Sequence, residues 1–192
     1  NYQADFLKQL PTGYSHVLYT DGGDSMFLAP MDEIVTHYTE MGEPDMVCAA
    51  LNYMPEPWRD THPAGWYDGC FDSHEAFRFP CVGGYLARRE YAADMLTRMT
   101  LLPRQVSDDY WSWCDAWREG WFKPKLDSQC RIFQMDVRDL ADGDTPWRPR
   151  NQLTGSTPCI LHMSGGSTNP IDWKDQTMIP IAKRYGILQE DV

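Results

Sequence analysis

The chain has 192 residues and a mass of 22.2 kDa, with 42% hydrophobic and 23% charged residues. These values predict one globular domain, residues 1–192, and exclude a disordered or fibrous chain. The net charge of −11 opposes binding to nucleic acid or to an anionic membrane surface, because both require clustered basic residues. No apolar run is long enough to predict membrane insertion.

The first part of the chain predicts alternating helices and strands. Helical spacing occurs at 2–10 and at 31–41. The short apolar run at 16–20 predicts a buried strand, and the run at 45–51 predicts a second one. Residues 52–77 form a long loop rich in Pro, Trp and Asp, and such loops beside strand ends often carry function.

The second part of the chain continues this alternation. An apolar run at 79–87 contains two adjacent glycines and precedes helical spacing at 88–100. Short strands are predicted at 130–135 and at 158–163, and the stretch 141–155 between them is polar. This order of elements predicts an α/β fold.

The cysteines are scattered without a Cys-x-x-Cys pair, so the sequence contains no zinc-ribbon or thioredoxin motif. Buried thiols and disulfides are both compatible with this pattern. The sequence therefore leaves the compartment open between the cytoplasm and the lumen of the secretory pathway.

Two carboxylates, Asp21 and Asp24, follow the first predicted strand on a glycine turn. Carboxylates this close repel one another unless a cation lies between them, and their oxygens suit a divalent ion. His162 also ends an apolar strand beside glycines, and imidazole with carboxylates suits Mn²⁺ or a similar ion. The structural alternative is an ordinary Asp-Gly-Gly-Asp turn and a core histidine.

Ser107 begins a further predicted helix, with Asp108 and Asp109 in its first turn. Helix capping and the helix dipole explain this pattern without any function. A catalytic pair of carboxylates is the alternative.

Together these motifs resemble the GT-A-fold glycosyltransferases related to the glycosyltransferase domain of procollagen lysyl hydroxylases and to the collagen galactosyltransferases. The similar segments include an Asp-x-x-Asp strand, a Gly-Gly segment, an Asp-Asp helix start and a Leu-Asp…Ile-Phe-Gln stretch. They are residues 19–24, 47–58, 81–86, 107–110, 126–134 and 162–165. The resemblance implies a GT-A-like, Rossmann-like fold with a mixed sheet flanked by helices.

The resemblance also implies a metal-dependent enzyme that transfers a hexose from a UDP-sugar to a hydroxyl of a protein or glycan acceptor. Asp21, Asp24 and His162 would bind Mn²⁺, and Asp108 and Asp109 would be catalytic. The residues that the resemblance places around the UDP-sugar are Thr20, Asp21, Trp58 or Trp66, Gly83, Gly84, Ser164 and Gly165.

The chain departs from this family in several respects, and Cys81 and Ser164 each stand where the family has an asparagine. Thr168 stands where the family has a lysine that pairs with the diphosphate, and only residues 1–15 precede the Asp-x-x-Asp strand, where the family has a nucleotide-binding βαβ region. The alternative is therefore a non-catalytic GT-A-like binding or assembly module, shortened at the N-terminus, whose exposed sheet edge another chain or segment would cover. A hydrolase or phosphotransferase with the same metal site is a third possibility.

Overall fold

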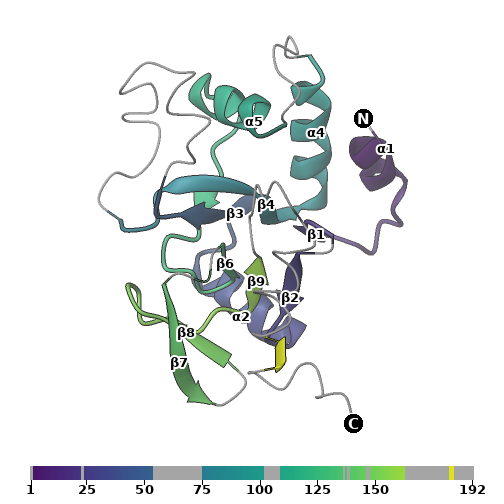
Figure 1. Ribbon diagram of the computed structural model, residues 1–192. Helices are drawn as coiled ribbons and strands as arrows, with labels where there is room; N and C mark the ends of the chain where they lie inside the picture. Colours follow the sequence, from purple (N-terminus) through teal and green to yellow (C-terminus); the bar gives the residue numbers. More distant parts are fainter. Residues whose placement is uncertain are drawn as a thin grey trace.

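The computed structural model describes nearly all of the predicted helices and strands, and Figure 1 shows their arrangement. The described residues are 2–22, 24–53, 75–101, 109–135, 137, 139–145, 148–162 and 182–183, with the backbone alone for 109–112 and 145. They form two mixed sheets flanked by helices and one two-stranded ribbon. The prediction of a mixed α/β structure is thus confirmed.

The first sheet has the strand order β1-β4-β3-β5. β1 (His16–Thr20) pairs antiparallel with β4 (Phe79–Arg88), and β4 pairs antiparallel with β3 (Met46–Leu51). β3 pairs parallel with β5 (Lys125–Leu126). β3 is buried along its whole length, as its uninterrupted apolar sequence predicts.

β1 differs from the prediction of a buried strand, because it lies at the edge of this sheet among the described strands and is only partly buried. His16 is exposed and the remaining residues of β1 are half-buried. The apolar run arises because Val17, Leu18 and Tyr19 pack partly against the cores on the two faces of the sheet. An edge strand with both faces in partial contact has the same short apolar sequence as a central strand.

The second sheet has the order β2-β9-β6. β2 (Ser25–Phe27) pairs antiparallel with β9 (Ile160–His162), and β9 pairs parallel with β6 (Phe133–Gln134). The sequence predicted the regions of β9 and β6 but not β2, which has only three residues.

A separate antiparallel ribbon consists of β7 (Leu140–Thr145) and β8 (Arg148–Asn151). The sequence predicted only a polar segment at 141–155. The two strands contain Asp, Gly and Pro, which are uncommon in strands, so composition does not identify them.

Helices cover the first sheet on both sides (Figure 1). α1 (Tyr2–Gln9), α4 (Arg89–Met99) and α5 (Asp109–Arg118) share one core with Tyr85 of β4. α2 (Met31–Glu40) shares the other core with β3, β4, β6 and β9. Within the described ranges, no helix combines the length and the apolar character that crossing a membrane requires.

Candidate metal centre

Three strand ends bring Asp21, Asp24 and His162 together. Asp21 follows β1, Asp24 precedes β2, and His162 is the last residue of β9. Ser25 of β2 pairs with His162, so the loop from β1 to β2 crosses from the first sheet to the second. This crossing carries both carboxylates to the imidazole.

The three side chains are close enough to share one ion. His162 Nε2 lies 3.3 Å from Asp21 Oδ2 and 3.2 Å from Asp24 Oδ1. Two ligand atoms at right angles on an octahedral ion, each about 2.1 Å from it, are about 3 Å apart. The measured separations are near that value, and two carboxylates with one imidazole form a donor set suited to Mn²⁺.

Burial makes this arrangement costly without a further partner. The His162 side chain is 2% exposed. Among the described residues, neither its ring nitrogens nor Asp24 Oδ1 have a hydrogen-bond partner. Buried polar atoms of this kind destabilise a folded protein unless something satisfies them. A cation between the carboxylates and Nε2 would satisfy both Asp24 Oδ1 and Nε2.

The two carboxyl groups have opposite pKa shifts. The neighbouring His162 ring, helped by the Tyr19 hydroxyl, holds the pKa of Asp21 below its usual value against the effect of burial. Burial raises the pKa of Asp24, and the negative charge of Asp21 adds to this shift, while the His162 ring opposes it. A bound cation would counteract both effects that raise the pKa of Asp24.

Gly83 of β4 lies against two residues of this centre, His162 and Asp21. The Asp21 backbone N–H donates to the Gly83 carbonyl oxygen over 3.0 Å. A methyl group at Gly83 would overlap the His162 ring and would lie 2.9 Å from Asp21 Oδ2. Gly84 is also buried, but it packs on the Phe133 ring, which a methyl group there would meet at 2.8 Å. Thr20, which ends β1, pairs with Gly84 and is half-buried.

Other predicted site residues are not placed. Asp109 begins α5, but its side chain is not described. The following predicted residues lie outside the described ranges: Trp58, Trp66, Asp108, Ser164 and Gly165. Their predicted roles stay predictions.

Tyr19 is a candidate site residue that the sequence motifs did not indicate. Its hydroxyl donates a hydrogen bond to Asp21 Oδ1 over 2.9 Å. The available signal was the spacing, because residues two apart at the end of a strand point to the same side. Tyr19 and Asp21 have this spacing.

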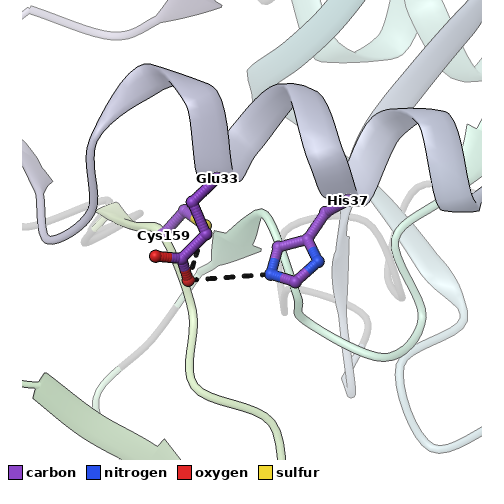
Figure 2. A group of neighbouring side chains, drawn as sticks. All are labelled: Glu33, His37 and Cys159. Atoms are coloured by element: carbon purple, nitrogen blue, oxygen red, sulfur yellow. Dashed lines mark hydrogen bonds and ion pairs between the residues drawn. The ribbon is translucent and has the colours of Figure 1, made fainter.

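A second group of potential ligands, Glu33, His37 and Cys159, lies between α2 and the residue before β9 (Figure 2). Glu33 Oε1 is 3.8 Å from both Cys159 Sγ and His37 Nε2. However, Arg148 Nη2 lies 2.8 Å from Glu33 Oε1, and Arg131 Nη2 lies 2.8 Å from His37 Nδ1.

These two arginines disfavour a metal at the second group. If Nδ1 of His37 accepts from Arg131, then Nε2 carries the ring proton and has no lone pair for a metal. Burial, with the charge of Glu33 adding to it, raises the pKa of Cys159 to about 12, which disfavours the thiolate that a metal requires. We therefore interpret this group as a hydrogen-bonded ion-pair cluster that fastens α2 to the second sheet.

The sequence was also compared with known proteins. No family model matches the chain, and no curated protein has significant sequence similarity to it.

Proposed function

We propose that the chain is a metal-dependent glycosyltransferase that transfers a hexose from a UDP-sugar to a hydroxyl acceptor. Asp21, Asp24 and His162 would hold Mn²⁺ or another divalent cation. The observation that carries the proposal is the meeting of these ligands from three strand ends, with buried atoms of His162 and Asp24 lacking other partners among the described residues. A GT-A-like fold is part of the same proposal.

The exposure of the ligands fits a cation that also contacts a substrate. His162 closes the inner side of the centre, whereas the Asp21 and Asp24 side chains are 43% and 30% exposed. A catalytic metal site keeps a coordination position open for water or substrate. The half-exposed carboxylate side is where a diphosphate would complete the coordination.

In the proposed reaction, the cation and the side chains of the chain would have different roles. When bound, a divalent cation stabilises negative charge on the leaving diphosphate as a Lewis acid. Asp21, Asp24 and the buried His162 would hold this cation between the ends of the two sheets. Asp108 and Asp109 are the proposed catalytic carboxylates, which would accept the proton of the acceptor hydroxyl or support positive charge on the sugar. That last assignment rests on the sequence motif alone.

Calorimetric titration of UDP tests the donor site. We expect UDP to bind in the presence of Mn²⁺ and not when a chelator replaces the metal. The exposed Asp94, in α4, supplies a matched control, so Asp94→Asn should bind UDP as the parent does, whereas Asp24→Asn should not. Absence of UDP binding in both conditions would contradict a working donor site and favour the non-catalytic module.

Transfer requires a separate test. UDP release from a panel of UDP-sugars should depend on Mn²⁺ and on an added hydroxyl acceptor. Asp109→Asn should keep the UDP affinity and lower the rate of transfer, because its proposed role is in the chemical step. Equal activity of Asp109→Asn and the parent would remove that role.

A further inference from the structure

Tyr19 and Asp21 form one unit at the end of β1. The Tyr19 hydroxyl donates to Asp21 Oδ1 over 2.9 Å, and the other oxygen, Oδ2, lies 3.3 Å from His162 Nε2. The two oxygens of this carboxyl group therefore have different neighbours. A carboxyl group held at one oxygen cannot rotate freely about its terminal bond, so Oδ2 stays turned toward the histidine.

The position of the Tyr19 hydroxyl is itself fixed by packing. Tyr19 is paired across the strands with Tyr85 of β4. Their rings stack with centroids 4.9 Å apart and an interplanar angle of 14°. Tyr85 is 3% exposed and packs on Trp113 of α5, with ring centroids 5.5 Å apart. The half-buried ring of Tyr19 is thus supported by core side chains of β4 and α5.

We infer that Tyr19 is a positioning residue of the metal centre, which determines the Asp21 oxygen that faces the cation. The inference rests on the proposed metal site. Tyr19 acts through Asp21 and does not contact the cation itself. Hydrogen-bond partners of ligating groups typically change metal affinity about 10- to 100-fold when removed, because they set the orientation and basicity of the ligand.

The competing explanation is that the hydrogen bond only stabilises the edge strand. β1 has a neighbouring strand on one side within the described part of the sheet, so a local bond near its end would help to hold it. The two explanations differ in what they predict for the folded protein. A purely structural bond lowers the free energy of unfolding but leaves the affinity of the folded chain for Mn²⁺ unchanged.

The experiment measures Mn²⁺ affinity of the full chain, by calorimetry and by the electron paramagnetic resonance signal of Mn²⁺, in the parent and in Tyr19→Phe. This substitution keeps the ring and its stacking on Tyr85 and removes only the hydroxyl. Tyr91→Phe is the matched control, because the Tyr91 hydroxyl accepts from the Lys123 backbone N–H at 3.3 Å, away from the centre. Near-UV circular dichroism checks that each variant is folded.

We expect Tyr19→Phe to weaken Mn²⁺ binding about 10- to 100-fold and to alter the resonance signal of the bound ion, with Tyr91→Phe equal to the parent. Equal affinity of Tyr19→Phe and the parent, when Asp24→Asn has lost binding, would overturn the role of Tyr19 and leave the metal centre standing. Absence of Mn²⁺ binding in the parent would overturn the metal centre, and the role of Tyr19 with it.

Discussion

The Gly83 backbone lies against the His162 imidazole with no space for a side chain between them. A methyl group at Gly83 would overlap the ring and would also come within 2.9 Å of Asp21 Oδ2. The glycine lets β4 approach the strand end that carries His162, and the Gly83 carbonyl accepts the Asp21 N–H at 3.0 Å. A residue without a side chain thus determines how closely two of the proposed ligands meet.

Gly83→Ala should therefore weaken Mn²⁺ binding at the proposed metal centre, although it replaces none of the proposed ligands. The added methyl group must displace His162 or Asp21, and we expect at least about a tenfold loss of Mn²⁺ affinity, comparable to the loss of a supporting contact. Overpacking at a buried position should also cost about 1–3 kcal/mol of unfolding free energy. Mn²⁺ titration and urea denaturation measure the two effects.

Gly22 provides the control for that substitution. It lies in the same loop as Asp21, and a methyl group there would meet nothing within 4 Å. Gly22→Ala should bind Mn²⁺ as the parent does. If Gly83→Ala also keeps the parent affinity, the close approach of β4 is irrelevant to the site.

Asp127 is a buried residue that binds the backbone of the segment leading into β6. Its carboxylate accepts the backbone N–H groups of Arg131, Ile132 and Phe133 at 3.0, 2.7 and 2.8 Å, and it is 0% exposed. Asp127→Ala would leave these amides without their acceptor, and each unsatisfied buried group costs about 1–3 kcal/mol. We expect a loss of at least about 3 kcal/mol in urea denaturation.

Asp127→Asn separates the hydrogen bonds from the space that the side chain fills. The amide keeps one of the two acceptor oxygens, so this variant should be less destabilised than Asp127→Ala. Stability of Asp127→Ala within about 1 kcal/mol of the parent would show that the three amides find other partners.

The ion pair between Glu33 and Arg148 should give a specific dependence of stability on pH. The Arg148 guanidinium holds the pKa of Glu33 below 4.5, against the effect of burial. Because the folded-state pKa is depressed, the contribution of Glu33 is fully present above 4.5 and is lost as the pH falls through the folded-state pKa. The difference in melting temperature between the parent and Glu33→Gln should therefore be constant near neutrality and shrink in acid.

Glu119, which is exposed after α5, supplies the comparison. Near neutrality, the melting temperature of Glu119→Gln should be closer to that of the parent than the melting temperature of Glu33→Gln is. A difference between the parent and Glu33→Gln that does not decrease in acid would contradict the role assigned to the ion pair.

The second ligand group should not contribute to cation binding. Cys159 is fully buried, Arg148 contacts the Glu33 oxygen that a metal would need, and Arg131 contacts Nδ1 of His37, which disfavours a lone pair on Nε2. We expect Cys159→Ser to bind Mn²⁺ with the parent affinity, measured by calorimetry. A marked loss of affinity in this variant would place a metal at the second group.

Part of this structure could be predicted from the sequence. β3 and the strand ends at Asp21 and His162 have strong local signals, namely uninterrupted apolar runs that stop at polar and glycine residues. The helical spacing at 88–100 also predicted α4. Its buried face, however, includes Ala92 and Ala93, whereas the larger Tyr91 and Met99 are only partly buried. Small side chains are buried there because they permit close packing, which spacing of large residues does not detect.

The grouping of Asp21, Asp24 and His162 was predicted, but the strand arrangement that produces it was not. The sequence predicted that Asp21, Asp24 and His162 lie at the ends of buried strands. Instead, β1 lies at the edge of the described part of its sheet, and the proposed ligands come from two different sheets. The three-residue strand β2, which joins them, is too short to have a periodic pattern. Pairing between strands distant in sequence depends on tertiary contacts, and no local pattern records it.

Of the two alternatives for the cysteines, buried thiols or disulfides, the described residues support buried thiols. Cys48, Cys130 and Cys159 are buried free thiols, and Cys81 and Cys114 are buried too. Burial raises the pKa of Cys48 well above its usual value, which makes its thiol unreactive in the folded chain. Cys70 lies outside the described residues.

The most direct measurement is calorimetric titration of Mn²⁺ into the parent and into Asp21→Ala, Asp24→Ala and His162→Ala, with circular dichroism to confirm folding. We predict that the parent binds Mn²⁺ and that each substitution removes or sharply weakens this binding while the chain stays folded. Mn²⁺ affinity that is unchanged in all three variants would contradict the metal centre.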